Sequence, residues 1–218
     1  SLRAGPSPAR GGTGGVSRRP HKFDPARAEQ LEHPERQEFL PNERVLDLLD
    51  LRGGETVVDY GAGIGILAVP LARRLPRGVV HAVDESPEMV ERLRERVERA
   101  GLPNVRTHLV EENRVQLESG VADRILAVNV LHEVVGETAL AEMRRLLAPD
   151  GFLLCVDWRS DVEREMGPPR EVSLSPEEGR SMLEEAGFSA DPVEGFPYHF
   201  AFLARPAVGA TGPAGEGP

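Results

Sequence analysis

The residue types best suited to chemistry lie together in one short stretch, Val57 to Gly65. An apolar strand end there leads into Asp59 and then into three glycines spaced two apart, with an apolar helical run directly after them. Glycine lets a backbone turn tightly and approach a ligand that a Cβ atom would keep away. A carboxylate beside such a turn repels a diphosphate, whereas it suits a ligand with an ammonium group or hydroxyl groups. The stretch therefore predicts a small-ligand site of the second kind.

The glycine spacing argues against a dinucleotide site. The G-x-G-x-x-G pattern of such sites, begun at Gly61, requires a glycine at the position of Ile66. An NAD-linked oxidoreductase is therefore the least favoured of the functions we considered.

A second acidic residue follows where a nucleoside site needs one. Residues 79–84 (VVHAVD) are typical of a strand that ends in Asp84. In nucleotide-binding α/β folds, an acid at the end of the second strand accepts hydrogen bonds from ribose hydroxyls. The order of strand, D-x-G-x-G-x-G turn, helix, strand and Asp84 resembles motif I of the class I S-adenosylmethionine (SAM) dependent methyltransferases.

The resemblance implies SAM as the cofactor and gives each residue a role. The glycine turn passes beneath the amino-acid part of SAM, Asp59 orients that turn or meets the ammonium group, and Asp84 holds the ribose. Residues 111–113, which depart from the Gly-Asp pair usual in the family, follow the third strand, where adenine is contacted. The residues expected to bind the cofactor are Asp59, Tyr60, Gly61, Gly63, Gly65, Asp84, Glu85, Glu112, Asn113 and Asn129.

Each of these roles has a purely structural alternative. Asp59 can cap local backbone N–H groups, and Asp84 can do the same beside Ser86. Residues 111–113 can form a solvated loop. The sequence by itself leaves these alternatives open.

The residues after the fourth expected strand indicate the acceptor. Family members that methylate amide or exocyclic nitrogens carry an Asn/Asp-Pro-Pro-aromatic sequence here, whereas this chain has Asn129-Val-Leu-His132. The Leu-His pair resembles the branch that methylates small molecules, type 11 or quinone-methyltransferase-like. His132 is the candidate catalytic residue, because an imidazole titrates near neutral pH and can accept a proton from a hydroxyl or carbon acid. A structural histidine is the alternative.

Strand and helix signals alternate along the chain, which predicts an α/β fold of the Rossmann-like, doubly wound kind. We expect a mostly parallel sheet with helices on both faces, and the resemblance implies seven strands with an antiparallel last strand at 196–206. Ligands in such sheets bind at the carboxyl ends of the strands, where Asp59, Asp84 and Asn129 fall. Expected strands are 56–60, 79–84, 104–110, 123–129 and 152–158, and expected helices are 64–75, 86–101, 137–148 and 176–187.

The composition predicts the domain organisation and excludes some classes of partner. Residues 1–20 and 206–218 are mostly Gly, Pro, Ala and Ser, so we expect disordered tails around one SAM-binding domain, 21–205, with an N-terminal lid at 21–50. The net charge of −10 argues against nucleic acid as a partner.

No apolar stretch is long enough to span a bilayer, so we expect no membrane partner and a cytoplasmic protein. The single cysteine, Cys155, excludes a multi-cysteine zinc site, and we expect no metal.

The leading hypothesis is a methyltransferase that moves a methyl group from SAM to a small-molecule acceptor by in-line displacement. Such a reaction depends mainly on alignment, so a triad is not required. We expect residues 21–40 and 157–172 to build the acceptor pocket, with Tyr198 and His199 adding to its wall. A SAM-binding sensor or partner module without catalysis stays open as the alternative, because binding and turnover use the same residues.

Overall fold

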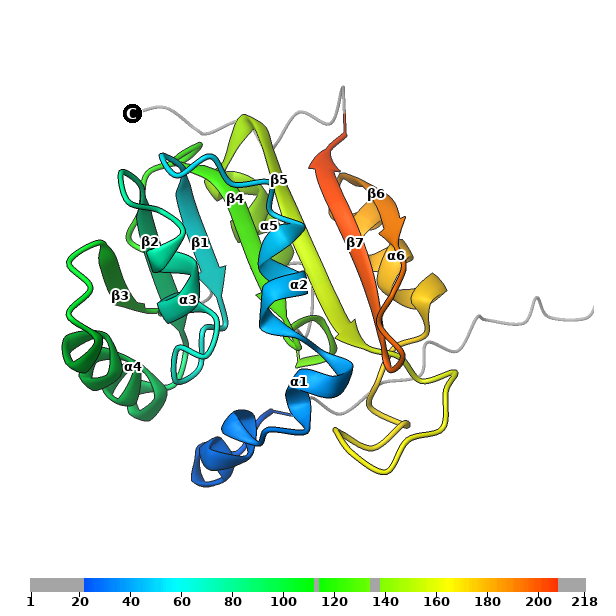
Figure 1. Cartoon of the computed structure of the whole chain (residues 1–218). Helices are drawn as coiled ribbons and strands as arrows, with labels where there is room; N and C mark the ends of the chain where they lie inside the picture. Colours follow the sequence, from blue (N-terminus) through cyan, green and yellow to red (C-terminus); the bar gives the residue numbers. More distant parts are fainter. Residues whose placement is uncertain (1–21, 112–113, 134–137, 208–218) are drawn as a thin grey trace, which may run out of the picture.

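The computed structural model describes residues 22–111, 114–133 and 138–207. Its centre is a seven-stranded sheet in the order β3-β2-β1-β4-β5-β7-β6 (Figure 1). Strands β1 to β5 run parallel, and β7 runs antiparallel to both β5 and β6. The predicted α/β class and antiparallel last strand are confirmed. The strands are β1 Thr56–Tyr60, β2 Val79–Asp84, β3 Val105–Leu109, β4 Ala122–Val128, β5 Leu147–Trp158, β6 Phe188–Val193 and β7 His199–Pro206.

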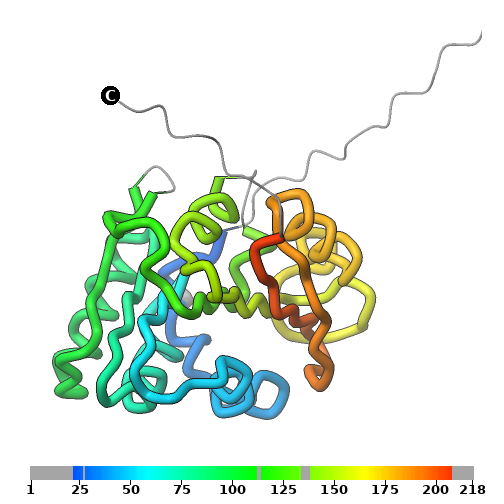
Figure 2. The backbone as a smooth tube through the Cα atoms, turned by 90° about the horizontal axis from the view of Figure 1, so that it is seen from above, coloured from blue at the N-terminus to red at the C-terminus, as the bar shows by residue number. Residues whose placement is uncertain are grey.

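Helices cover both faces of the sheet (Figure 2). Leucines of α2, α3 and α4 form a buried cluster on one face, and side chains of α5 and α6 form a second cluster on the other. Within the described ranges, no helix is long and apolar enough to cross a membrane. The helices are η1 Pro25–Glu32, α1 Arg36–Phe39, α2 Asn42–Asp47, α3 Ala68–Arg73, α4 Pro87–Ala100, η2 Leu131–Glu133, α5 Thr138–Leu146 and α6 Pro176–Glu185, where η denotes a 3-10 helix.

The best-predicted helices have local caps. At the start of α4, the Ser86 hydroxyl accepts a hydrogen bond from the Met89 N–H at 3.3 Å, and Gly101 ends the helix with φ +63°. At the start of α6, Ser175 and Glu178 exchange hydrogen bonds of 3.1 and 2.7 Å, which form a capping box. These boundaries are set by residues close in sequence.

Three elements differ most from expectation. Helix α3 begins at Ala68 rather than near residue 64, because Gly65 has φ +83°, which a right-handed helix cannot include. Strand β5 begins at Leu147, because this residue pairs with Ala122 of β4 across a register shift. Strand β6 had no predicted range. It is an edge strand, where Pro192 is tolerated but weakens the sequence pattern.

The limits of the domain also need correction. Strand β7 includes Pro206, opposite Phe188, and the Ala207 N–H donates to the Gly187 carbonyl at 2.9 Å. The sheet therefore takes in Pro206, the first residue of the expected C-terminal tail, and Ala207 is hydrogen-bonded beside it. At the other end, Leu40 and α2 belong to the buried layer on the sheet, so the part of the expected lid after residue 39 is core. Residues 1–20, and the C-terminal tail from residue 208, lie outside the described residues.

A histidine pair on the sheet should make stability depend on pH. The rings of His81 and His108 meet through Nδ1 and Nε2 at 2.9 Å. Burial, and then neighbouring positive charge, lower the pKa of His81 to about 4 and also lower the pKa of His108. In the unfolded chain, a histidine has a pKa of about 6.5, so the unfolded chain binds more protons than the folded chain below that pH. Stability is therefore lost as the pH falls from about 6.5 towards 4.

We expect His81 to contribute a loss of about 2 kcal/mol in unfolding free energy between about pH 7 and pH 4.5. Urea unfolding at both pH values measures the loss for the unmodified chain and for His81→Gln. The variant should lose less, because glutamine does not titrate. Equal losses in the two proteins would contradict this linkage.

Candidate functional site

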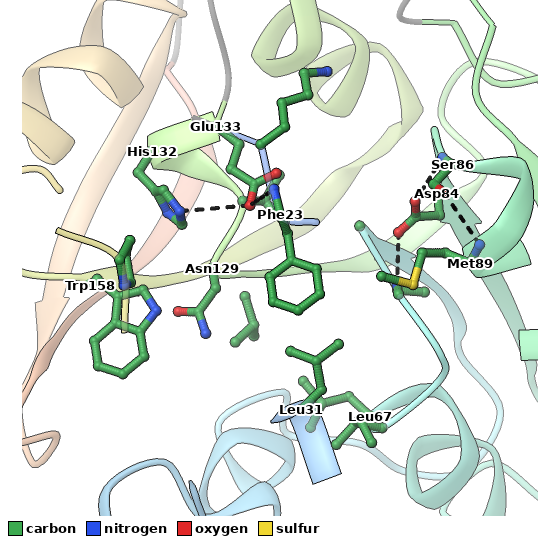
Figure 3. A pocket seen from close by; sticks show the side chains of 18 of the residues that line it. Phe23, Leu31, Leu67, Asp84, Ser86, Met89, Asn129, His132, Glu133 and Trp158 are labelled. Carbon is green, nitrogen blue, oxygen red and sulfur yellow. Dashed lines mark hydrogen bonds and ion pairs between the residues drawn. The ribbon is translucent and has the colours of Figure 1, made fainter. Parts of the chain in front are cut away.

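A cavity of about 770 Å³ lies at the carboxyl ends of the central strands. Residues at the ends of β1, β2, β4 and β5 line it, and so do N-terminal residues such as Phe23 and Leu31 (Figure 3). The segment 166–169 also lines it. This is where ligands bind in open α/β sheets. The cavity brings together most of the residues that the sequence indicated.

Asp84 connects the glycine turn to the start of α4. Its Oδ2 accepts a hydrogen bond from the Gly63 N–H at 2.8 Å, and its Oδ1 accepts one from the Ser86 N–H at 2.9 Å. Burial raises the pKa of Asp84, while these two N–H groups oppose the rise. Each carboxylate oxygen keeps a further lone pair, so Asp84 caps the backbone and can still receive ribose hydroxyls. The functional and structural roles of this residue are compatible.

Packing restricts two of the three glycines of the turn, Gly61 and Gly65, more than it restricts Gly63. A Cβ atom at Gly61 would lie 2.5 Å from a methyl carbon of Val130, and one at Gly65 would lie 2.5 Å from a methyl carbon of Leu93. A Cβ atom at Gly63 would meet only Leu31, at 3.6 Å. Packing thus demands glycine at both ends of the turn. Gly65 does not line the cavity, contrary to its predicted cofactor role, because it packs against α4.

Two buried side-chain oxygens of residues that line the cavity lack a hydrogen-bond partner among the described residues. Asp59 is 3% exposed, and its Oδ2 has no hydrogen-bond partner among the described residues. Burial, followed by the charge of Asp84, raises the pKa of Asp59 to about 7, and Arg36 opposes this. The Oδ1 atom of Asn129, a residue with φ +59°, also lacks a partner within the described chain. Unpaired buried oxygens are costly, so a ligand that donates hydrogen bonds is expected there.

Arg36 was not predicted from the sequence. It lines the cavity, and its Nη1 donates to Asn42 Oδ1 at 2.6 Å. Burial lowers the pKa of Arg36 to about 10, and Asp59 opposes the drop, so the guanidinium stays charged at neutral pH. Arg36 and Asp59, whose charges interact, can hold the carboxylate and the ammonium of an amino acid.

The other predicted cofactor residues have different outcomes. Tyr60 lines the cavity, and burial raises its pKa to about 12. Glu85 also lines the cavity and forms an ion pair with Lys22. Glu112 and Asn113 lie outside the described residues.

His132 is held by a buried carboxylate that the sequence did not reveal. Asp157 Oδ1 lies 2.7 Å from His132 Nδ1, and Oδ2 accepts the His132 backbone N–H at 2.9 Å. Asp157 is fully buried at the end of β5. Burial lowers the pKa of His132, but Asp157 and then Glu133 raise it more, so it lies above its ordinary value. The position of Asp157 near the end of an expected strand was the one feature of the sequence that could have indicated its role.

Trp158 and the segment 166–169 form the wall beside His132. Gly167 has φ +85°, and a Cβ atom there would lie 2.9 Å from the Trp158 indole, so only glycine lets the backbone lie on this ring. The expected wall from 157–172 is therefore partly present. Tyr198 and His199 do not line the cavity, contrary to expectation. The His199 ring lies behind the indole, with ring centres 4.1 Å apart.

Comparison with known proteins identifies the family. The family model for a methyltransferase domain matches residues 57–151. The crystal structure of a SAM-dependent methyltransferase from Aquifex aeolicus is 35% identical, with a TM-score of 0.79, over 84% of this chain and 98% of that one. The chain belongs to the class I SAM-dependent methyltransferases. The methyltransferase family membership inferred from the glycine turn and Asp84 is thus confirmed.

Two curated relatives differ in how much of their length this methyltransferase matches. Trans-aconitate 2-methyltransferase from Rhodococcus jostii is 48% identical over 66 residues, which are 30% of this chain and 26% of that protein. Malonyl-[acyl-carrier protein] O-methyltransferase from Geobacter sulfurreducens is 29% identical over 185 residues, or 74% of this chain and 68% of that protein. The chain thus spans about a quarter of the first relative and about two thirds of the second.

SAM, the cofactor of the family, fits the residues of this methyltransferase. Asp59 and Arg36 suit its ammonium and carboxylate groups, and Asp84 suits its ribose hydroxyls. Gly63 leaves open space where the backbone faces the cavity. Among the described residues, no group of three or more His, Cys, Asp or Glu side chains could hold a metal ion.

Proposed function

We propose that this methyltransferase transfers a methyl group from SAM to the hydroxyl group of a small, uncharged acceptor held between His132 and Trp158. The observation that carries the proposal is that His132, which is held from behind by the buried Asp157, lines the same cavity as Asp59, Gly63 and Asp84. Bound SAM supplies a positively charged sulfonium with an electrophilic methyl group.

The His132–Asp157 pair suits an acceptor that must lose a proton. The carboxylate accepts a hydrogen bond from Nδ1–H, which leaves the lone pair on Nε2 of the neutral ring. The hydroxyl proton would pass to His132 Nε2 as the oxygen takes the methyl group. Asp157 would stabilise the imidazolium that results, as a buried acid does for other catalytic histidines.

The remaining lining favours an uncharged acceptor of the small-molecule kind. Trp158, Phe39 and Pro168 provide apolar surface in the same cavity as His132. The acids Asp59 and Glu133 also line the cavity, and they would repel an anionic acceptor. Cover from the N-terminal residues and from 166–169 would keep water away from the reacting groups.

Methyl transfer can be tested with SAM labelled on its methyl group. The protein is incubated with a metabolite extract, and we expect label in the extractable small-molecule fraction together with S-adenosylhomocysteine (SAH). Binding of SAM and SAH should quench the fluorescence of Trp158, the single tryptophan of the chain, whereas NAD should not. Tight SAM binding without SAH formation across such extracts would instead support a sensor without catalysis.

A further inference from the structure

Residues 22–32, here called the strap, cross the cavity above the glycine turn. Phe23 and Leu31 pack with Ile64 and Met89 in a small apolar cluster. In Figure 3, Phe23 lies between the Asp84 side and the His132 side of the cavity. The strap therefore covers the space between the cofactor residues and the acceptor residues.

Polar contacts with other described residues hold the strap, and they reach both halves of the site. Lys22 forms an ion pair with Glu85, which follows β2. The Phe23 N–H donates to Glu133 Oε1 at 3.1 Å, and Glu133 follows β4 next to His132. At its far end, Glu32 forms an ion pair with Arg96 of α4.

The Glu133 contact differs from the other two because it reaches the proposed base. The same oxygen that accepts the Phe23 N–H lies 3.7 Å from His132 Nε2. The Glu133 side chain is only 22% exposed. Burial raises the pKa of Glu133 to about 7, with further contributions from the charges of Asp157 and Glu85, while His132 and the Phe23 N–H oppose the rise.

We propose that Glu133 is a positioning residue that fastens the strap over the cofactor and also sets the charge beside His132. One carboxyl group then couples closure of the cavity to the strength of the base. The inference rests on the proposed function, because His132 is the base there.

The physical reason lies in the position of Oε1. While the strap is closed, this oxygen is kept from water and receives a backbone N–H, so its negative charge is weakly screened towards His132. The charge favours the imidazolium that forms when the acceptor loses its proton. Release of the strap would remove the N–H donor and hydrate the carboxylate. Water would then screen the charge more strongly, and the charge would favour the imidazolium less.

Two substitutions separate the two roles of Glu133. Glu133→Gln keeps an oxygen for the Phe23 N–H but removes the charge, so we expect the pKa of His132 to fall by about one unit with nearly unchanged SAH affinity. Glu133→Ala removes both, so we expect the same fall in pKa and SAH binding that is about tenfold weaker. Calorimetry measures the affinity, and NMR titration of the histidines measures the pKa.

Lys22→Ala is the matched control, because it cuts another contact of the strap without changing the charge beside His132. It should weaken SAH binding and, in the SAH-bound protein where the strap is closed, leave the pKa of His132 in place. Unchanged SAH affinity in Glu133→Ala, or an unchanged His132 pKa in Glu133→Gln, would overturn the coupling. These measurements need no acceptor and no turnover, so they remain distinct from a failure of the proposed methyl transfer.

Discussion

Replacing His132 with alanine is expected to lower turnover by about 10²–10⁴ while SAM affinity stays within a few-fold of the original. The reason is the geometry around the ring, which is fixed by Asp157 at 2.7 Å while the ring itself lines the cavity. Alanine removes the proton acceptor but leaves Asp59, Asp84 and the glycine turn in place. Turnover is measured with saturating SAM and a substrate found by the labelling experiment.

The pH dependence of the rate gives a second readout for His132. A base must be unprotonated, so kcat/KM should rise with pH through the pKa of His132, which lies above its ordinary value. Asp157→Asn removes the charge that raises this pKa, so the acidic limb should move to lower pH. His132→Ala should lack the limb. If the folded His132→Ala protein kept full turnover, the histidine would have no catalytic part, and alignment alone would explain the rate.

Replacing Asp84 with alanine is expected to weaken SAM and SAH binding by about ten- to a hundredfold. The change removes the acceptor for ribose hydroxyls, and a hydrogen bond to a charged group contributes about 1.5–3 kcal/mol. It also releases the N–H groups of Gly63 and Ser86, so the glycine turn loses its connection to α4. Calorimetry with SAH measures the loss without any turnover.

Asp47→Ala is the matched control for this experiment. Asp47 is an exposed acid of α2 that pairs with Arg74 at 2.7 Å and does not line the cavity. Its loss should leave SAH affinity unchanged. An Asp84→Ala protein that binds SAH as tightly as the Asp47→Ala control would contradict the assignment of Asp84 to the ribose.

The elements predicted best are those whose boundaries are encoded locally. Strands β1 and β2 have the predicted bounds, and α4 lies within one residue of its expected range at each end, because apolar runs and caps act within a few residues. The location of β6 was missed, because an edge strand with Pro192 has a weak pattern and forms only by pairing with β7. The same holds for the start of β5, which depends on its register with β4.

The cofactor side of the site was largely predictable for the same reason. Asp59, the glycine turn and Asp84 follow strand ends, and parallel strands bring their carboxyl ends to one edge of the sheet. The exception is Gly65, whose glycine is required by Leu93 of a later helix rather than by a ligand. A spacing pattern cannot distinguish these two causes.

The sequence by itself determined the fold class, the family and most of the predicted cofactor residues that line the cavity, because those depend on strand ends, caps and glycine spacing along short stretches. Only the tertiary structure decided which groups act together across the cavity. Asp157 reaches His132 because β5 lies beside β4, and Phe23 reaches Glu133 because the strap crosses the sheet edge. Arg36 joins Asp59 in the same way. Such pairs have no periodic signal, since packing between distant segments fixes both their distance and their shared burial.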